Sequence, residues 1–117
     1  MTNEIKSGGK VIATITQRQA IAFQLHIPGA EEPIYVPAWA NTVAIDEDGA
    51  IWAYESVAED VRIVCEEHKA WSDWGKVEAN MQEIGEMPCV PDWTEAKIDL
   101  RAMKWHFLVN ARSTDRA

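Results

Sequence analysis

The sequence predicts an α+β fold, in which an antiparallel sheet of about four to five strands, formed by residues 10–55, is covered by one or two helices. Three observations support this prediction. Apolar and polar residues alternate along three stretches before residue 47, as in half-buried strands. A turn signal, Asp46-Glu47-Asp48-Gly49, joins two of the predicted strands. After Ser56, apolar residues recur at helical spacing.

The first predicted strands lie in residues 10–27. Residues 10–16 form one strand, residues 17–19 a turn and residues 20–27 a second strand. A helix over residues 16–25 is the competing interpretation, but strict alternation favours the strand. The alternating apolar side chains of the second strand are Ile21, Phe23, Leu25 and Ile27. Residues 34–36, between two prolines, are predicted to be a short strand at a sheet edge.

A hairpin is predicted at the centre of the chain, with arms at residues 42–46 and 50–54. Gly49 suits the left-handed conformation that closes such a turn. The second arm is apolar on both faces, since Trp52 and Tyr54 alternate with Ile51 and Ala53. We therefore expect an inner strand with another element packed over it.

Helices are expected after the hairpin. Ser56 followed by Glu59 matches a capping box, which predicts an amphipathic helix over residues 57–70. Residues 76–84 are predicted to form a short second helix, and residues 93–111 a third. A strand is the alternative for the last segment, because three of its large residues alternate: Trp105, Phe107 and Val109.

The length of 117 residues suits a single domain, which we place at residues 10–111. Residues 1–9 and 112–117 are polar and are predicted to be flexible tails. No apolar run reaches the length that spans a bilayer, and residues 1–10 lack the core of a signal peptide. We expect a cytoplasmic protein without membrane association, whose cysteines Cys65 and Cys89 are reduced.

The net charge of −8 is unevenly distributed. Residues 46–99 contain fifteen acidic and four basic residues, a net charge of −11. This segment argues against direct binding of nucleic acid, since phosphate contacts require Lys and Arg. It is compatible with a basic protein partner, and also with an acidic surface that only keeps the protein in solution.

No catalytic, cofactor or metal residue is predicted. Cys65, His68 and Cys89 lack the second short-spaced pair that a structural zinc site usually has. The acidic turn at residues 46–49 resembles the start of a calcium loop, but Val57 occupies the position where that loop needs a bidentate Glu. The sequence shows no nucleophile with both a base and an orienting group.

The sequence Pro37-Ala-Trp-Ala40, followed by the hairpin Val43-Ala-Ile-Asp-Glu-Asp-Gly-Ala-Ile-Trp-Ala-Tyr54, resembles small uncharacterised accessory proteins of tailed bacteriophages. In those proteins an aromatic-rich turn, an Ile-Gly pair and a terminal Trp segment follow. The corresponding residues here are Trp71-Ser-Asp-Trp74, Ile84-Gly85 and Asp92-Trp93. Residues 94–97 depart from the usual terminal pattern, and residues 10–27 lie outside the resemblance. It implies a phage or prophage origin and no defined biochemistry.

These features predict a phage-encoded, non-enzymatic protein that binds a host protein with a basic surface in the host cytoplasm. Inhibition of a defence or nucleic-acid enzyme is one form of this function, in which the acidic segment replaces nucleic-acid phosphates. The alternatives are a minor virion or assembly component and a small enzyme of unidentified chemistry. The candidate partner-binding residues are Glu59, Asp60, Glu66, Glu67, Trp71 and Trp74.

Overall fold

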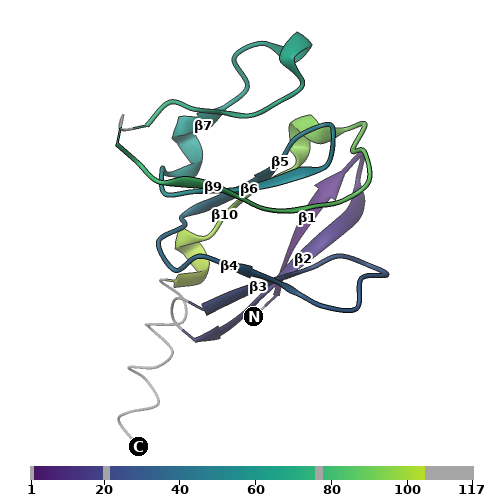
Figure 1. Ribbon diagram of the computed structural model, residues 1–117, viewed down its shortest axis with the longest axis vertical. Helices are drawn as coiled ribbons and strands as arrows, with labels where there is room; N and C mark the ends of the chain where they lie inside the picture. Colours follow the sequence, from purple (N-terminus) through teal and green to yellow (C-terminus); the bar gives the residue numbers. More distant parts are fainter. Residues whose placement is uncertain (1, 20–21, 76–77, 105–117) are drawn as a thin grey trace, which may run out of the picture.

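The computed structural model describes residues 2–19, 22–75 and 78–104 and contains two four-stranded antiparallel sheets (Figure 1). The first sheet has the strand order β1-β2-β3-β4. Its strands are β1 (Thr2–Ser7), β2 (Lys10–Gln19), β3 (Ala22–His26) and β4 (Ile34–Val36). Each strand pairs with the one that follows it in sequence, so this sheet is a simple meander.

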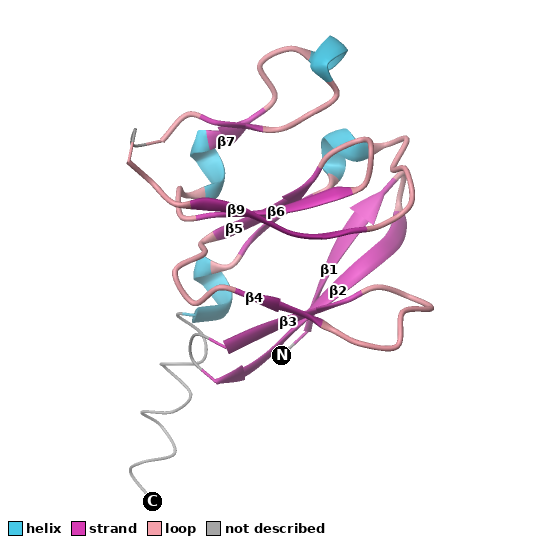
Figure 2. Ribbon diagram, in the orientation of Figure 1, coloured by secondary structure: helices cyan, strands magenta, loops and turns pink. Residues whose placement is uncertain are grey.

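The second sheet has the order β10-β5-β6-β9, so its two edge strands come from late in the chain. Figure 2 shows that strands make up most of the regular structure and that the helices are short. Its strands are β5 (Thr42–Ile45), β6 (Ala50–Tyr54), β9 (Met81–Glu86) and β10 (Lys97–Asp99). Between β6 and β9 lies a two-stranded ribbon, β7 (Val61–Arg62) and β8 (Ser72–Asp73). The 3-10 helices are η1 (Ala58–Asp60), η2 (Glu66–His68) and η3 (Trp93–Glu95), and residues 101–104 are helical.

One hydrophobic core joins the two sheets. Inward-facing side chains of both sheets form a single cluster. Its fully buried members include Ile15 and Leu25 from the first sheet and Val43, Ile45 and Ile51 from the second. The two layers are therefore held together mainly by burial of aliphatic side chains.

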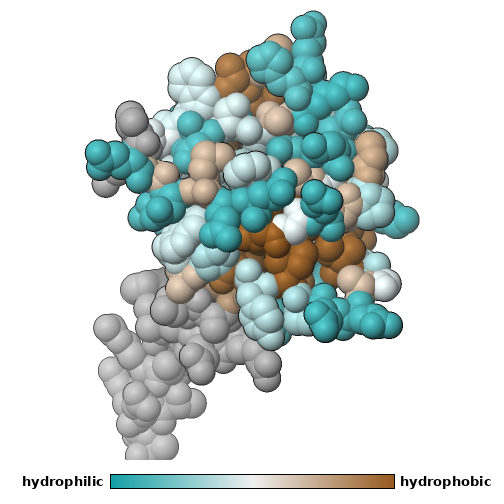
Figure 3. All heavy atoms as spheres, viewed as in Figure 1, coloured by the Kyte–Doolittle hydropathy of each residue, from teal (hydrophilic) through white to brown (hydrophobic). Residues whose placement is uncertain are grey.

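The edges of the two sheets also meet. Strand β1 contacts β10 and η3, and β4 contacts β9. Where β4 meets β9, the side chain of Ile34 lies against Gly85. Figure 3 shows hydrophobic residues gathered between these two strands. Both pairs of edge strands are thus partly covered, which protects them from pairing with other chains.

The central hairpin is confirmed. β5 pairs with β6 in the register Ile45↔Ile51, and Gly49 has φ +94°. The turn is closed by the Gly49 amide, which donates to the Asp46 carbonyl at 2.9 Å. Strand β6 is buried on both faces, as predicted for an inner strand. The edge position predicted for residues 34–36 is also confirmed.

The predicted α+β class, with helices covering one sheet, is wrong. Residues 57–70 contain η1, β7 and η2 in place of an amphipathic helix. Ser56 does not form the capping box, because its hydroxyl has no hydrogen-bond partner. The segment also contains several β-branched residues, which have lower helix propensity: Val57, Val61, Ile63 and Val64.

The helices predicted later in the chain are also corrected. Residues 81–86 of the predicted helix 76–84 form β9, which pairs with β6. In the predicted helix 93–111, residues 97–99 form β10 against β5, and helical backbone begins at residue 101. Residues 105–111 lie outside the described part. Pairing with distant strands overrides the helical spacing in both segments.

The N-terminal part of the chain is more regular than predicted. Residues 2–7, expected to belong to a flexible tail, form β1 and pair with β2, and Ile5 is buried in the core. Residues 17–19, expected to be a turn, continue β2. The C-terminal tail predicted at residues 112–117 lies outside the described residues.

Candidate functional site

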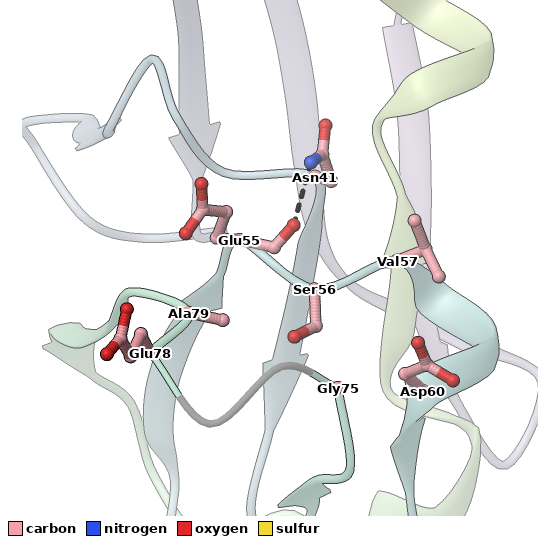
Figure 4. A pocket seen from close by; sticks show the side chains of 8 residues that line it. All are labelled: Asn41, Glu55, Ser56, Val57, Asp60, Gly75, Glu78 and Ala79. Carbon is pink, nitrogen blue, oxygen red and sulfur yellow. Dashed lines mark hydrogen bonds between the residues drawn. The ribbon is translucent and has the colours of Figure 1, made fainter.

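An acidic pocket of about 480 Å³ lies where the chain leaves β6 (Figure 4). Its walls come from residues 55–57 after β6, from Asp60 in η1, from Gly75 after β8 and from residues 78–79 before β9. Lys76 and Val77, which connect the last two segments, lie outside the described residues. The described lining residues, which include three carboxylates and no basic side chain, are Asn41, Glu55, Ser56, Val57, Asp60, Gly75, Glu78 and Ala79.

Glu55 is fixed in place at one side of this acidic pocket. Its carboxylate Oε1 accepts hydrogen bonds from the Asn80 backbone amide at 2.9 Å and from Asn80 Nδ2 at 3.3 Å. Its backbone carbonyl accepts from Asn41 Nδ2 at 2.7 Å. These contacts hold Glu55 between the end of β6 and the start of β9, so its charge is fixed before any ligand binds.

Ser56 is the unusual residue of the pocket. It is only 8 % exposed, and its Oγ has no hydrogen-bond partner, whereas its backbone carbonyl accepts from Thr42 Oγ1 at 2.8 Å. A Cβ added at Gly75 would overlap Ser56 Oγ, so a residue without a side chain is needed there. Figure 4 shows the hydroxyl pointing toward the space between Gly75 and Ala79. A buried hydroxyl without a partner is costly, and such groups need an explanation.

The unpartnered hydroxyl gives a stability prediction. Ser56→Ala is expected to raise the free energy of unfolding by about 1 kcal/mol, because a buried polar group without a hydrogen bond is removed. Thr42→Val is the matched opposite, since it removes a hydroxyl that donates to the Ser56 carbonyl, and it should lower stability by about 1 kcal/mol. Urea unfolding measures both. A loss of stability in Ser56→Ala would show that the hydroxyl has a partner in solution.

Trp74 directly precedes Gly75, which lines the acidic pocket, and is 60 % exposed. Its backbone amide donates to the Asp60 carbonyl at 2.7 Å, and the amide of Gly75 donates to Asp73 Oδ1 at 2.9 Å. Of the five tryptophans that the structure describes, Trp74 is the only exposed one. An exposed Trp whose backbone is bonded to a residue of an acidic pocket is typical of a binding surface.

Glu59, another predicted site residue, is already paired. Arg101 Nη2 donates to its two carboxylate oxygens at 2.7 and 2.8 Å. The pKa of Glu59 lies below its usual range, because the carboxylate accepts from its own backbone amide and from Arg101. Its charge is therefore compensated within the chain, and we remove it from the candidate site.

The other residues predicted to bind a partner lie in three different parts of the structure. Asp60 lines the acidic pocket next to Trp74. Glu66 and Glu67 are exposed on η2, at the tip of a loop away from the pocket (Figure 1). Trp71 is 9 % exposed, and its Nε1 donates to the Ile45 carbonyl at 3.0 Å, so it belongs to the core. Of the six candidates, the structure brings together only Asp60 and Trp74.

Sequence reasoning missed three of the carboxyl and hydroxyl groups of the pocket. Glu55 and Glu78 are two of nineteen acidic residues, so composition alone does not distinguish them. Ser56 was assigned to a helix cap. The sequence signal that could have indicated this site is Trp74-Gly75, where a residue without a side chain follows a large aromatic residue.

Arg101 donates hydrogen bonds to both Glu59 and Asp99, and these bonds predict that the stability of the fold depends on pH. Hydrogen bonds from Arg101 lower the pKa of Asp99, so the unfolded chain takes up protons first as the pH falls. The free energy of unfolding should therefore decrease below about pH 4. In Arg101→Gln this decrease should be shallower. Burial raises the pKa of Asp46, which acts in the opposite sense in both proteins. Identical pH dependence of the two proteins, measured by urea unfolding, would contradict this assignment.

A second pocket, of about 430 Å³, lies between the start of β2 and residues 87–92 and differs in chemistry. Most of its lining is aliphatic, sulfur-containing or proline. It contains one basic and one acidic side chain, those of Lys10 and Asp92. Of the two pockets, only the acidic pocket has more carboxylates than basic side chains among its described lining residues.

No group of His, Cys, Asp and Glu side chains within residues 2–19, 22–75 and 78–104 is arranged to hold a metal ion. In the same part of the chain, no helix is long and apolar enough to cross a membrane. Comparison of the chain with protein families, curated proteins and solved structures finds no match.

Proposed function

We propose that this chain is a phage-encoded, non-enzymatic protein that binds a basic surface of a host protein through the acidic pocket and Trp74. The observation that carries the proposal is that Trp74, the one exposed tryptophan described, directly precedes Gly75 of the pocket lining and donates its backbone amide to the carbonyl of Asp60. The phage origin rests on the resemblance of the Pro37–Tyr54 segment.

The two parts of this surface serve different steps of binding. The carboxylates, within a segment of net charge −11, attract a basic partner and accelerate encounter. Trp74 offers a large apolar area with an N–H donor, which is typical of residues that dominate binding energy. A basic surface is common in enzymes that bind nucleic acid, so we propose a defence or nucleic-acid enzyme as the target.

The chemistry of the acidic pocket supports binding over catalysis. Ser56 carries the only hydroxyl among its described lining residues, and no base lies within hydrogen-bond distance of that hydroxyl. An activated serine needs an adjacent base that takes its proton. Three carboxylates around the same space also disfavour the developing negative charge of an acyl-transfer reaction.

Quantitative capture tests the proposal. The tagged chain is incubated with a lysate of the host bacterium prepared during phage infection, and bound proteins are quantified for the wild type and for a triple variant, Glu55→Gln, Asp60→Asn and Glu78→Gln. We expect one stoichiometric host protein with a basic surface, and its loss in the triple variant. The control neutralises three exposed carboxylates elsewhere: Glu31→Gln, Glu32→Gln and Glu86→Gln.

Three outcomes would contradict the proposal. Equal capture by both triple variants would exclude the acidic pocket as the contact surface. Absence of any stoichiometric partner would contradict an interaction protein of this kind. Capture of virion proteins only would support the assembly alternative in its place.

A further inference from the structure

We propose that the acidic pocket receives the guanidinium group of one arginine side chain of the partner. This inference rests on the proposed function and specifies which group of the basic surface is recognised. It joins three observations: an excess of carboxylates among the described lining residues, an unpartnered buried hydroxyl, and a volume that accommodates a guanidinium group.

The charges around the acidic pocket select a cation. Glu55, Asp60 and Glu78 come from three different segments, and the described lining residues supply no positive charge. Asp60 also pairs with Arg62 at 3.6 Å, but the Arg62 side chain is mostly exposed, so this pair is weak. An anion would be repelled here. Metal binding is disfavoured because the described residues provide no ligand cluster.

Ser56 supplies the second, independent observation. Its side chain is more than nine-tenths buried, its Oγ has no hydrogen-bond partner, and it faces the acidic pocket (Figure 4). A hydroxyl oxygen accepts a hydrogen bond from a charged N–H donor, and such a bond is stronger than one between neutral groups. An incoming guanidinium would therefore remove the cost that the free protein carries at this atom.

The shape of the acidic pocket favours arginine over lysine. Acceptors lie at separate positions around a space of about 480 Å³, and a planar guanidinium presents five N–H donors in several directions. Val57 and Ala79 provide apolar wall on which the methylene stem of the side chain can pack. A compact ammonium group would reach fewer of these acceptors at once.

The test uses Nα-acetyl-arginine amide as the probe, with the lysine and citrulline analogues for comparison. Citrulline keeps the shape of arginine without its charge. Backbone amide signals of the ¹⁵N-labelled full chain are followed by NMR during each titration. We expect shifts concentrated at Ser56, Gly75 and Glu78, with the strongest binding for arginine, weaker binding for lysine and none for citrulline. Equal binding of citrulline, or shifts elsewhere only, would overturn the inference.

Two variants sharpen this titration. Ser56→Ala, which is expected to fold with increased stability, should bind the arginine probe about tenfold more weakly, since one hydrogen bond to a charged group is lost. The Glu55, Asp60 and Glu78 triple variant should not respond. The control triple variant at Glu31, Glu32 and Glu86 should respond like the wild type. Unchanged affinity in Ser56→Ala would remove the hydroxyl from the site and overturn the inference.

The titration and the capture experiment fail separately. If the partner is captured through the acidic pocket but the arginine probe does not bind, the partner is recognised in another way and only this inference falls. If the probe binds at Ser56 but no stoichiometric partner is captured, the arginine site stands and the proposed function falls.

Discussion

Replacing Gly49 by valine is expected to lower the free energy of unfolding by about 3 kcal/mol or more. Two effects add. Gly49 has φ +94°, a conformation that a β-branched residue adopts only with strain. A Cβ at this position would also overlap the Met87 carbonyl oxygen. Urea unfolding of the purified variant measures the loss.

Gly29→Val is the matched control for this prediction. Gly29 has a similar φ of +88°, but nothing lies within 4 Å of the position that a Cβ would take. The control should lose only the part due to backbone strain, about 1–2 kcal/mol. Equal losses in the two variants would show that the segment at Met87 does not lie against the turn.

The difference in unfolding free energy between Gly49→Val and Gly29→Val measures how tightly the segment after β9 packs against the hairpin turn. The Met87 amide donates to the Gly49 carbonyl at 2.9 Å, and the Val90 amide donates to the Glu47 carbonyl at 2.8 Å. The strand β9 thus continues into a segment that binds the turn directly. A side chain at Gly49 would displace this segment and weaken the β6–β9 edge of the second sheet.

Trp71→Ala is expected to cost about 3–5 kcal/mol of unfolding free energy, because a large buried aromatic side chain is deleted. Its ring stacks edge-on against Trp93 with centroids 5.9 Å apart, and Lys97 Nζ lies 5.1 Å from its centroid. Its Nε1 donates to the Ile45 carbonyl, which an alanine would leave without this donor.

Trp74→Ala distinguishes the binding role that we assign to Trp74 from the structural role of Trp71. Trp74 is exposed, so its removal should change stability by less than about 0.5 kcal/mol while weakening partner capture. Thermal and urea unfolding, measured on both variants, compare the two residues. A large stability loss in Trp74→Ala, or a small one in Trp71→Ala, would reverse the roles that we assign to them.

The hairpin was predictable because its determinants are local. Asp46 and Gly49 specify a turn within a few residues, and the alternation in the flanking arms requires no knowledge of distant partners. The short strand at residues 34–36 was predictable for the same reason, since the flanking prolines confine it to an edge.

The partition into two sheets was not predictable from local pattern. Met81 and Ile84 are three residues apart, which suits a helix, but β9 pairs with β6 from Met81 to Glu86 with one register shift at Ile84. Similarly, β10 pairs with β5 across more than fifty residues of sequence. These segments are placed by pairing between distant parts of the chain, and local propensity yields to it.

The candidate site was predictable only in part. Asp60 and Trp74 were selected because charged and aromatic residues dominate interfaces, and the structure places them side by side. The assumption of a helix also grouped Glu66 and Glu67 with them, and the 3-10 turns separate these residues. Ser56 was hidden by the capping pattern, whose hydrogen bond does not form.

The central claim is that the acidic pocket and Trp74 together bind a basic host protein, and association kinetics with the captured partner test it most directly. The association rate should fall steeply with salt for the wild type, because surface charges are screened beyond about 8 Å at physiological ionic strength. The triple variant at Glu55, Asp60 and Glu78 should associate slowly with little dependence on salt. Trp74→Ala should mainly accelerate dissociation. An association rate that is equal in the wild type and the triple variant at low salt would contradict the claim.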